Sequence, residues 1–426
     1  MGLSKKHRAV AGFLALCLVV PVSCSLRSPA PPETLTGAQE AVSRARSSTA
    51  PRIPEEVLSN AGLEEIWYSP SSSVHDRRDA GVHTAYLLDE GIVLVTRSRK
   101  PEGDRLIKLL KRADGLPVWW EAIEGPVVEA PFVFTYPAGI AKDPEMFFRV
   151  HDTIHCVDFR HGSHLWKKQV EPPIASRIVA DDTHVFFGSE NNRLYGYRKG
   201  AAFDDWSYGT GGRSPTAPVI NSSRVVFGSF DGGIYGMVPD QGWVSFRSWK
   251  RATGGAIVGG IASYSRWVFV GSTDYKLYCL EGSDGSVYWS FVAGAPIREA
   301  PVVFRHRANQ EYVYCISTEG NRRPRRTLFA VPIPKGRAPR GVALWRKEGV
   351  RQVVTIGRDT LYVLADDRDR SLIGLDVKTG EEKFRISLAG FNFVPTNHAD
   401  SGRNSRERGR IYLISRAGAI QCIGES

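Results

Sequence analysis

The chain has 426 residues, of which 42% are hydrophobic, as in ordinary globular proteins. This length and composition exclude a chain too small or too polar to bury a large core. The formal net charge of +11 favours anionic partners such as lipid head groups, acidic polymers or acidic proteins. A positive surplus of this size is also common as a general bias of a solvated surface.

The N-terminus has the pattern of a secretory signal. Lys5, Lys6 and Arg8 precede an apolar run of 14 residues, 9–22, which is too short for a comfortable transmembrane helix. We therefore predict a signal peptide at residues 1–23 and export of the protein.

Cys24 stands at the expected cleavage site, and its surroundings resemble the lipobox of bacterial lipoproteins. In that family the cysteine is acylated and becomes the mature N-terminus, so the resemblance implies a lipid anchor on Cys24. Pro21 departs from the pattern, because the family usually has an aliphatic residue there. Simple cleavage and release of a soluble protein therefore stays open as the alternative.

A low-complexity segment follows the signal. It is rich in Pro, Ser, Ala and Thr and has no sustained hydrophobic period. Such a composition predicts a Pro/Ser-rich tether, which we place at residues 24–61. Strand patterns separated by turns dominate from there onward, so residues 62–426 are expected to form the folded domain.

One sequence motif recurs within this domain and predicts its fold. It consists of an apolar strand, a Gly-Ser step, a polar turn and a second apolar strand, and it begins at Val185, Val225 and Val268. The glycines of successive copies are 40 and then 43 residues apart, which is the period of a four-stranded propeller blade. Length alone would suggest two or three domains, but repeats of this period can close into a single ring.

A second signature marks the outer strand of each blade. A glycine that suits a tight turn is followed four positions later by an aromatic residue expected to pack between blades. These aromatics are Trp119, Trp166, Phe246, Trp289, Trp345 and Phe384, and Trp206 follows Gly200 with two extra residues. Ala-Pro steps at residues 130, 217 and 300 mark the start of inner strands.

The two ends of the domain complete one more blade. Residues 411–423 repeat the middle of a blade and then lack an outer strand, whereas residues 63–68, with Trp67, form an outer strand without a blade before it. Joining them would remove open sheet edges. We predict an all-β fold, an eight-bladed β-propeller of four-stranded antiparallel blades, with the ring closed by the N-terminal strand.

The cysteines follow the same repeat. Cys156, Cys279 and Cys422 occupy equivalent places in blades too far apart for a disulfide, so we expect buried free thiols. A disulfide between Cys279 and Cys315, in neighbouring blades, stays open.

The order of these signals resembles the PQQ-like β-propeller repeat over nearly the whole chain after residue 62, most clearly at 185–291. The best copy combines Ala300-Pro301-Val302 with residues 268–280 and 284–289. The architecture is most similar to the BamB-type lipoproteins of the outer-membrane β-barrel assembly machine. That resemblance implies an exported, lipidated, non-enzymatic propeller that binds periplasmic parts of the assembly machinery.

The other branch of the superfamily comprises quinoprotein alcohol dehydrogenases, which hold PQQ and Ca²⁺ in the central pocket. Those enzymes usually have adjacent paired cysteines against the cofactor, and this chain has no Cys-Cys step. We could not match their acidic and amide Ca²⁺ ligands or their Asp base either. We therefore expect no enzymatic activity and no cofactor. A PQQ-dependent oxidoreductase, or a small-ligand binder that uses the central funnel, remains the alternative.

Two clusters invite a metal site and are expected to be ordinary surface. His151, His155, His161 and His164 are close in sequence but fall at separate ends of one blade, without zinc-like spacing. The acidic run at residues 366–369 lacks the central Gly and the closing Glu of an EF-hand. We predict surface turns in the first case and a solvated loop in the second.

A basic stretch enlarges one blade and is the candidate interaction loop. Its cationic residues are Arg322, Arg323, Arg325, Arg326, Lys335, Arg337 and Arg340. Loops on a rigid ring often carry specificity, so an acidic protein, a phospholipid or an anionic polymer would suit this stretch. Residues 403–410 could extend the patch.

These observations together predict a non-catalytic interaction scaffold of the bacterial cell envelope, in the periplasm or at the outer membrane. We expect a monomer, held near the membrane through a lipid anchor, that binds an envelope protein and assists outer-membrane protein assembly. Binding of an anionic envelope polysaccharide through the basic loops is a third hypothesis. Nucleic acid is not an expected partner of an exported protein.

Overall fold

A computed structural model describes most of the chain after residue 49. The described residues are 50–70, 79–98, 105–200, 204–213, 216–240, 248–306, 310–320, 324–334, 340–398 and 408–426. Cys24, Phe246, Arg322, Arg323, Lys335 and Arg337 lie outside them. No helix within the described ranges is long and apolar enough to cross a membrane.

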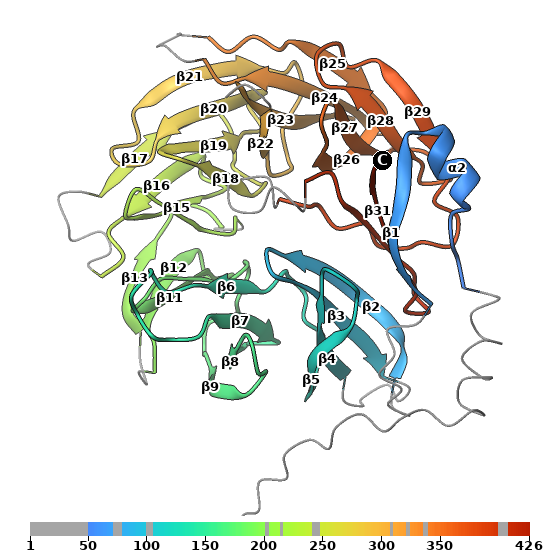
Figure 1. Cartoon of the computed structure of the whole chain (residues 1–426). Helices are drawn as coiled ribbons and strands as arrows, with labels where there is room; N and C mark the ends of the chain where they lie inside the picture. Colours follow the sequence, from blue (N-terminus) through green and yellow to red (C-terminus); the bar gives the residue numbers. More distant parts are fainter. Residues whose placement is uncertain are drawn as a thin grey trace, which may run out of the picture. The chain divides into compact units, whose positions relative to one another are not determined.

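Seven sheets of four consecutive antiparallel strands form the first seven blades, which we number in chain order (Figure 1). Blades 1 to 3 contain β2 (Asp79–Leu88), β3 (Gly91–Ser98), β4 (Arg105–Lys111) and β5 (Pro117–Ile123); β6 (Phe132–Phe134), β7 (Glu145–Val150), β8 (Thr153–Asp158) and β9 (His164–Gln169); and β10 (Val179–Ala180), β11 (His184–Gly188), β12 (Arg193–Arg198) and β13 (Asp204–Gly209).

Blades 4 to 7 follow the same pattern. They contain β14 (Val219–Asn221), β15 (Arg224–Gly228), β16 (Gly233–Met237) and β17 (Trp249–Ala252); β18 (Ile261–Tyr264), β19 (Trp267–Gly271), β20 (Lys276–Glu281) and β21 (Val287–Val292); β22 (Val302–His306), β23 (Gln310–Glu319), β24 (Arg325–Pro332) and β25 (Trp345–Glu348); and β26 (Val350–Ile356), β27 (Thr360–Ala365), β28 (Leu372–Asp376) and β29 (Glu382–Ile386).

Blade 8 joins the two ends of the domain, as predicted. β1 (Leu63–Ser69) pairs antiparallel with β31 (Ile420–Glu425), which pairs with β30 (Ile411–Ile414). The innermost strand of this blade is reduced to a single antiparallel bridge between Phe393 and Ile414. The eight-bladed, all-β ring closed by the N-terminal strand is therefore confirmed, with one shortened inner strand.

The described residues include part of the predicted tether, and this part packs on the propeller. The short helix α2 (Glu55–Asn60) precedes β1, and its Leu58 is fully buried in a cluster that includes Ile53 and residues of blades 7 and 8. The backbone of Ile53 also exchanges two hydrogen bonds with the buried side-chain amide of Gln421. The placement of residues 50–61 in the tether was therefore wrong, because two apolar side chains and an amide attach this segment to the propeller.

The outer-strand aromatics pack between neighbouring blades. Trp119 of blade 1 lies against Gly162, which has a φ of 73° in the turn of blade 2. The indole N–H of Trp119 donates to the carbonyl of Phe159, which also belongs to blade 2. Trp67, Trp206, Trp249 and Trp345 likewise donate to a backbone carbonyl of the next blade. A side chain would clash with the indole at Gly162, which explains the recurring glycine before each outer strand.

The register corrects one of the predicted aromatics. Each outer-strand aromatic stands opposite one residue of the third strand, as Trp206 does opposite Gly196 and Phe384 opposite Gly374. In blade 4 the residue opposite Gly236 is Trp249, and not Phe246. The four-residue spacing from Gly242 led to the wrong aromatic, because the connection before β17 is longer than in most of the other blades.

The cysteines fill equivalent core positions. Cys156, Cys279 and Cys422 stand opposite Trp166, Trp289 and Trp67 on the third strands, where little space is left beside an indole. All three, and Cys315, are buried and free, so no disulfide joins Cys279 to Cys315. Burial raises the pKa of the Cys156 and Cys315 thiols to about 12, which keeps them protonated and unreactive.

The antiparallel order defines two ends of the ring. Connections from one blade to the next, and loops between second and third strands, lie at one end, which we call the connector face. Loops between first and second strands, and between third and fourth strands, lie at the other end, which we call the turn face.

Candidate functional site

The basic stretch does not form a single loop. Arg325 begins β24 opposite Glu319, at the connector face, whereas Arg340 comes after the end of β24 at Pro332 and pairs with Ser290 in the middle of β21. β24 has eight residues, which corresponds to about 26 Å of extended chain at roughly 3.3 Å per residue. Arg325 therefore lies at the connector face, whereas Arg340 lies beside the outer strand of blade 5.

Arg326 forms ion pairs within the fold. Its guanidinium lies 2.9 Å from a carboxylate oxygen of Asp366 and 3.3 Å from one of Glu299. Burial raises the pKa of Glu299, and the guanidinium of Arg326 opposes that rise. Because these acids belong to loops on either side of blade 6, Arg326 connects neighbouring blades and is not available as a free docking group.

Arg340 also has a structural neighbour. Its backbone forms a parallel bridge with Ser290 of β21, and the N–H of Gly341 donates to the Ser290 carbonyl at 2.9 Å. This connection of blade 6 therefore runs along the outer strand of blade 5.

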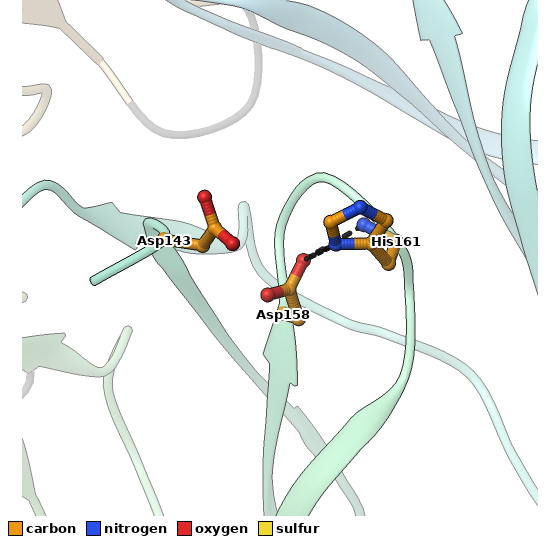
Figure 2. A group of neighbouring side chains, drawn as sticks. All are labelled: Asp143, Asp158 and His161. Atoms are coloured by element: carbon orange, nitrogen blue, oxygen red, sulfur yellow. Dashed lines mark hydrogen bonds and ion pairs between the residues drawn. The ribbon is translucent and has the colours of Figure 1, made fainter. Parts of the chain in front are cut away.

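Blade 2 holds a group of possible metal ligands on its turn face. Asp143, Asp158 and His161 offer ligand atoms that all lie within 4.8 Å of one another (Figure 2). Asp158 already accepts hydrogen bonds from the backbone of Arg160 and His161, and Arg160 pairs with Asp143 at 3.1 Å. Asp376 caps the equivalent turn of blade 7 in the same way, by accepting from the backbone of Lys378 and Thr379, so this group is explained by turn formation.

The other histidines of blade 2 are separate from this group. His155 lies inside β8 and stacks on Phe148 with ring centroids 5.0 Å apart, so its placement in a surface turn was wrong. Burial lowers the pKa of His155 to about 4. His164, on β9, lies 2.6 Å from a carboxylate oxygen of Glu121 in blade 1.

The described ends of the long connection of blade 8 join several blades at the turn face. The Asn397 side chain accepts a hydrogen bond from Arg112 of blade 1, and its backbone N–H donates to Val354 of β26. Farther along, Arg408 donates to the carbonyls of Gly357 and Arg305, in blades 7 and 6. No periodic signal in the sequence predicted these contacts, because they depend on single polar side chains in an irregular segment.

His398 follows Asn397 and lies beside β22, the inner strand of blade 6. Its ring stacks on Phe304 of blade 6, with centroids 6.4 Å apart, and stays accessible to solvent although protein surrounds it. Desolvation lowers the pKa of His398, and the positive charge of Arg177 lowers it further.

The described residues do not offer the ligand set that PQQ and Ca²⁺ require. Glu129 and Glu299 occupy equivalent positions before the inner strands of blades 2 and 6, and each pairs with an arginine, at 3.6 Å to Arg149 and 3.3 Å to Arg326. Over the described ranges, the group of Asp143, Asp158 and His161 is the one set of three possible metal ligands, and it lies in an outer turn. Calcium needs several converging oxygen ligands, so the described residues do not fit this cofactor.

A pocket of about 260 Å³ opens at the connector face among blades 7, 8 and 1. Its walls come from the first residues of β26, the end of β27, the segment 388–395 and Ala85 of β2. Arg351 and Arg370 contribute its only charged side chains. No local sequence signal predicted the pocket, because it joins four distant segments.

The sequence and the fold of this chain are similar to those of known proteins. The sequence model described as "Outer membrane protein assembly factor BamB" matches residues 140–248 and 241–424. A search of curated proteins finds no match. Among solved structures, BamB from Moraxella catarrhalis has a TM-score of 0.58 at 16% identity, covering 85% of this chain and 97% of its own.

Other propellers share the fold at similar levels. Quinohemoprotein alcohol dehydrogenase from Comamonas testosteroni has a TM-score of 0.56 at 12% identity, covering 90% of this chain and 79% of its own. The computationally designed Ika8 protein has a TM-score of 0.51 at 13% identity, covering 84% and 99%. At these identities the structural likeness shows the fold alone, whereas the sequence match spans more than half of the chain. The chain therefore belongs to the family described as outer membrane protein assembly factor BamB.

Proposed function

We propose that this protein is a non-catalytic interaction scaffold of the bacterial envelope that binds a protein partner and assists outer-membrane protein assembly. Membership of the BamB family supports this role. The observation that carries it furthest is the pairing of two acids that precede inner strands. Glu129 pairs with Arg149 and Glu299 with Arg326, which favours a structural role for these acids over a cofactor site.

The location belongs to the same proposal. The basic and apolar N-terminal pattern supports export, and Cys24 would anchor the mature chain to a membrane. Residues 25–49 would then give the propeller reach from that membrane. We propose that it acts as a monomer in the periplasm or at the outer membrane.

Affinity capture tests the scaffold role. Full-length tagged protein is expressed in its source bacterium and captured from detergent-solubilised envelopes, with untagged cells as the control. We expect an outer-membrane β-barrel or its assembly partners to co-purify in stoichiometric amount. A chain that elutes alone under gentle detergent would contradict the proposal.

A quinoprotein enzyme is the second candidate, since a quinohemoprotein alcohol dehydrogenase shares the fold. Titration of the purified protein with PQQ and Ca²⁺, followed by quinone absorbance and thermal unfolding, tests it directly. We expect neither saturable binding nor a shift of the unfolding temperature. Stoichiometric binding would establish a cofactor site and overturn the non-catalytic role.

Polysaccharide binding by the basic stretch has less support. Arg325 and Arg340 lie on different elements, at the connector face and beside β21, and Arg326 is paired with Glu299 and Asp366. Binding of an acidic polymer to the purified protein that weakens with added salt would support this hypothesis.

A further inference from the structure

The pocket at the connector face combines apolar walls with a cationic rim. Leu364, Leu388, Phe391, Phe393 and Val394 supply most of the apolar lining. Its volume of about 260 Å³ is below the roughly 300–1,000 Å³ of typical small-molecule sites. A pocket of this size suits one bulky side chain better than a whole cofactor.

Hydrogen bonds on two sides hold the wall of the pocket in place. The Gln352 side chain donates to the Val394 carbonyl and to Thr396, at 3.0 Å in each case. On the other side, the N–H of Phe393 donates to the Ile414 carbonyl at 3.0 Å. These bonds hold the segment that forms the apolar wall between β26 and β30, so the pocket is preformed.

The two arginines of the rim differ in the contacts that their side chains make. Arg370 donates one N–H to the Asn392 carbonyl at 2.7 Å, which fixes its guanidinium beside the pocket. Arg351 is exposed, and its positive charge acts on the carboxylate of Glu299, the pKa of which it lowers against the larger rise caused by burial. None of the residues that line the pocket is acidic. The site therefore has donor groups and positive charge that a carboxylate would satisfy.

We propose that this pocket receives a bulky apolar side chain that is flanked by a carboxylate and is presented by a protein partner. The apolar group would fill the space beside Phe391 and Phe393, and the carboxylate would bind Arg351 and Arg370. Interfaces are often dominated by such an anchor in a desolvated pocket with arginine nearby. The proposal rests on the scaffold function above and names the chemistry that the scaffold recognises.

Labelled peptides provide the test. Fluorescence anisotropy compares binding of three short capped peptides to the full chain: one with Phe between two Glu residues, one with Gln in place of both Glu residues, and one with Ala in place of Phe. We expect saturable binding of the first peptide and at least about tenfold weaker binding of the other two. Equal binding of all three would overturn the proposal.

Matched variants locate the binding. Arg351→Gln and Arg370→Gln are each expected to weaken binding of the first peptide at least about fivefold, because each removes one guanidinium that would bind the carboxylate. Arg368→Gln removes an exposed charge from the same loop without touching the pocket and should leave binding unchanged. An equal loss in Arg368→Gln would indicate non-specific attraction and would contradict the assignment.

Two further outcomes separate this proposal from the scaffold function. If N-acetylphenylalanine competes as well as the peptide, the pocket is a small-acid site and the protein-partner assignment is wrong. If the Arg351→Gln and Arg370→Gln double variant captures envelope partners as well as the parent chain, the scaffold role stands and this pocket does not serve it.

Discussion

At the scale of single residues, the space opposite each outer-strand aromatic governs packing between strands. A Cβ added to Gly196 would lie 2.5 Å from the Trp206 indole, closer than side chains normally approach. Gly196→Ala is therefore expected to lower the free energy of unfolding by about 1–3 kcal/mol, the usual cost of overpacking. Gly209→Ala is the control, because its Cβ would come no closer than 3.4 Å to the Arg193 side chain. Equal losses in urea unfolding of both variants would contradict this explanation.

His155 gives a residue-scale prediction for pH. Burial lowers its pKa to about 4, whereas an unfolded histidine titrates near 6.5. The unfolded chain therefore binds more protons between these values, so the contribution of His155 to stability falls as the pH drops from 6.5 towards 4. Replacement by Phe removes this titration.

The measurement compares the parent chain with His155→Phe at pH 7 and pH 5. We expect the parent to lose more stability than the variant between the two conditions, by on the order of 1 kcal/mol. Identical pH slopes would show that His155 keeps a normal pKa in the folded protein.

At the scale of elements, α2 tests where the folded domain begins. Leu58 is fully buried against blades 7 and 8, whereas Val57, the preceding residue of the same helix, is 40% exposed. Leu58→Ala should lower the free energy of unfolding by about 2–5 kcal/mol, and Val57→Ala by no more than about 0.5 kcal/mol. If both changes were equally mild in thermal unfolding, residues 50–61 would belong to the tether after all.

Element order was predictable from the sequence where a repeat carried it. The missing outer strand after Ile423 and the unpaired strand with Trp67 sufficed to predict the closure of the ring. α2 was missed because six residues are too few to show helical periodicity within a Pro- and Ser-rich context. The ion pairs of Arg326 and the connector-face pocket could not be predicted, since they unite residues tens to hundreds of positions apart.

At the scale of the whole molecule, β1 holds the ring closed by pairing with β31. Deletion of residues 61–68 would leave blade 8 without its outer strand and remove Trp67 from its place against Gly115. We expect a large fall in the unfolding temperature and broader unfolding. Deletion of residues 26–33, of equal length within the predicted tether, should leave the unfolding temperature unchanged. A closed, equally stable ring in the first deletion would contradict the role of β1.

The central claim is that this propeller assists outer-membrane protein assembly without catalysis. The most direct measurement is the amount of folded β-barrel protein in outer-membrane fractions of the source bacterium with and without this gene, with re-expression as the control. The account predicts a reduced amount in its absence and recovery on re-expression. An unchanged amount, under conditions in which the protein is normally present, would contradict the claim.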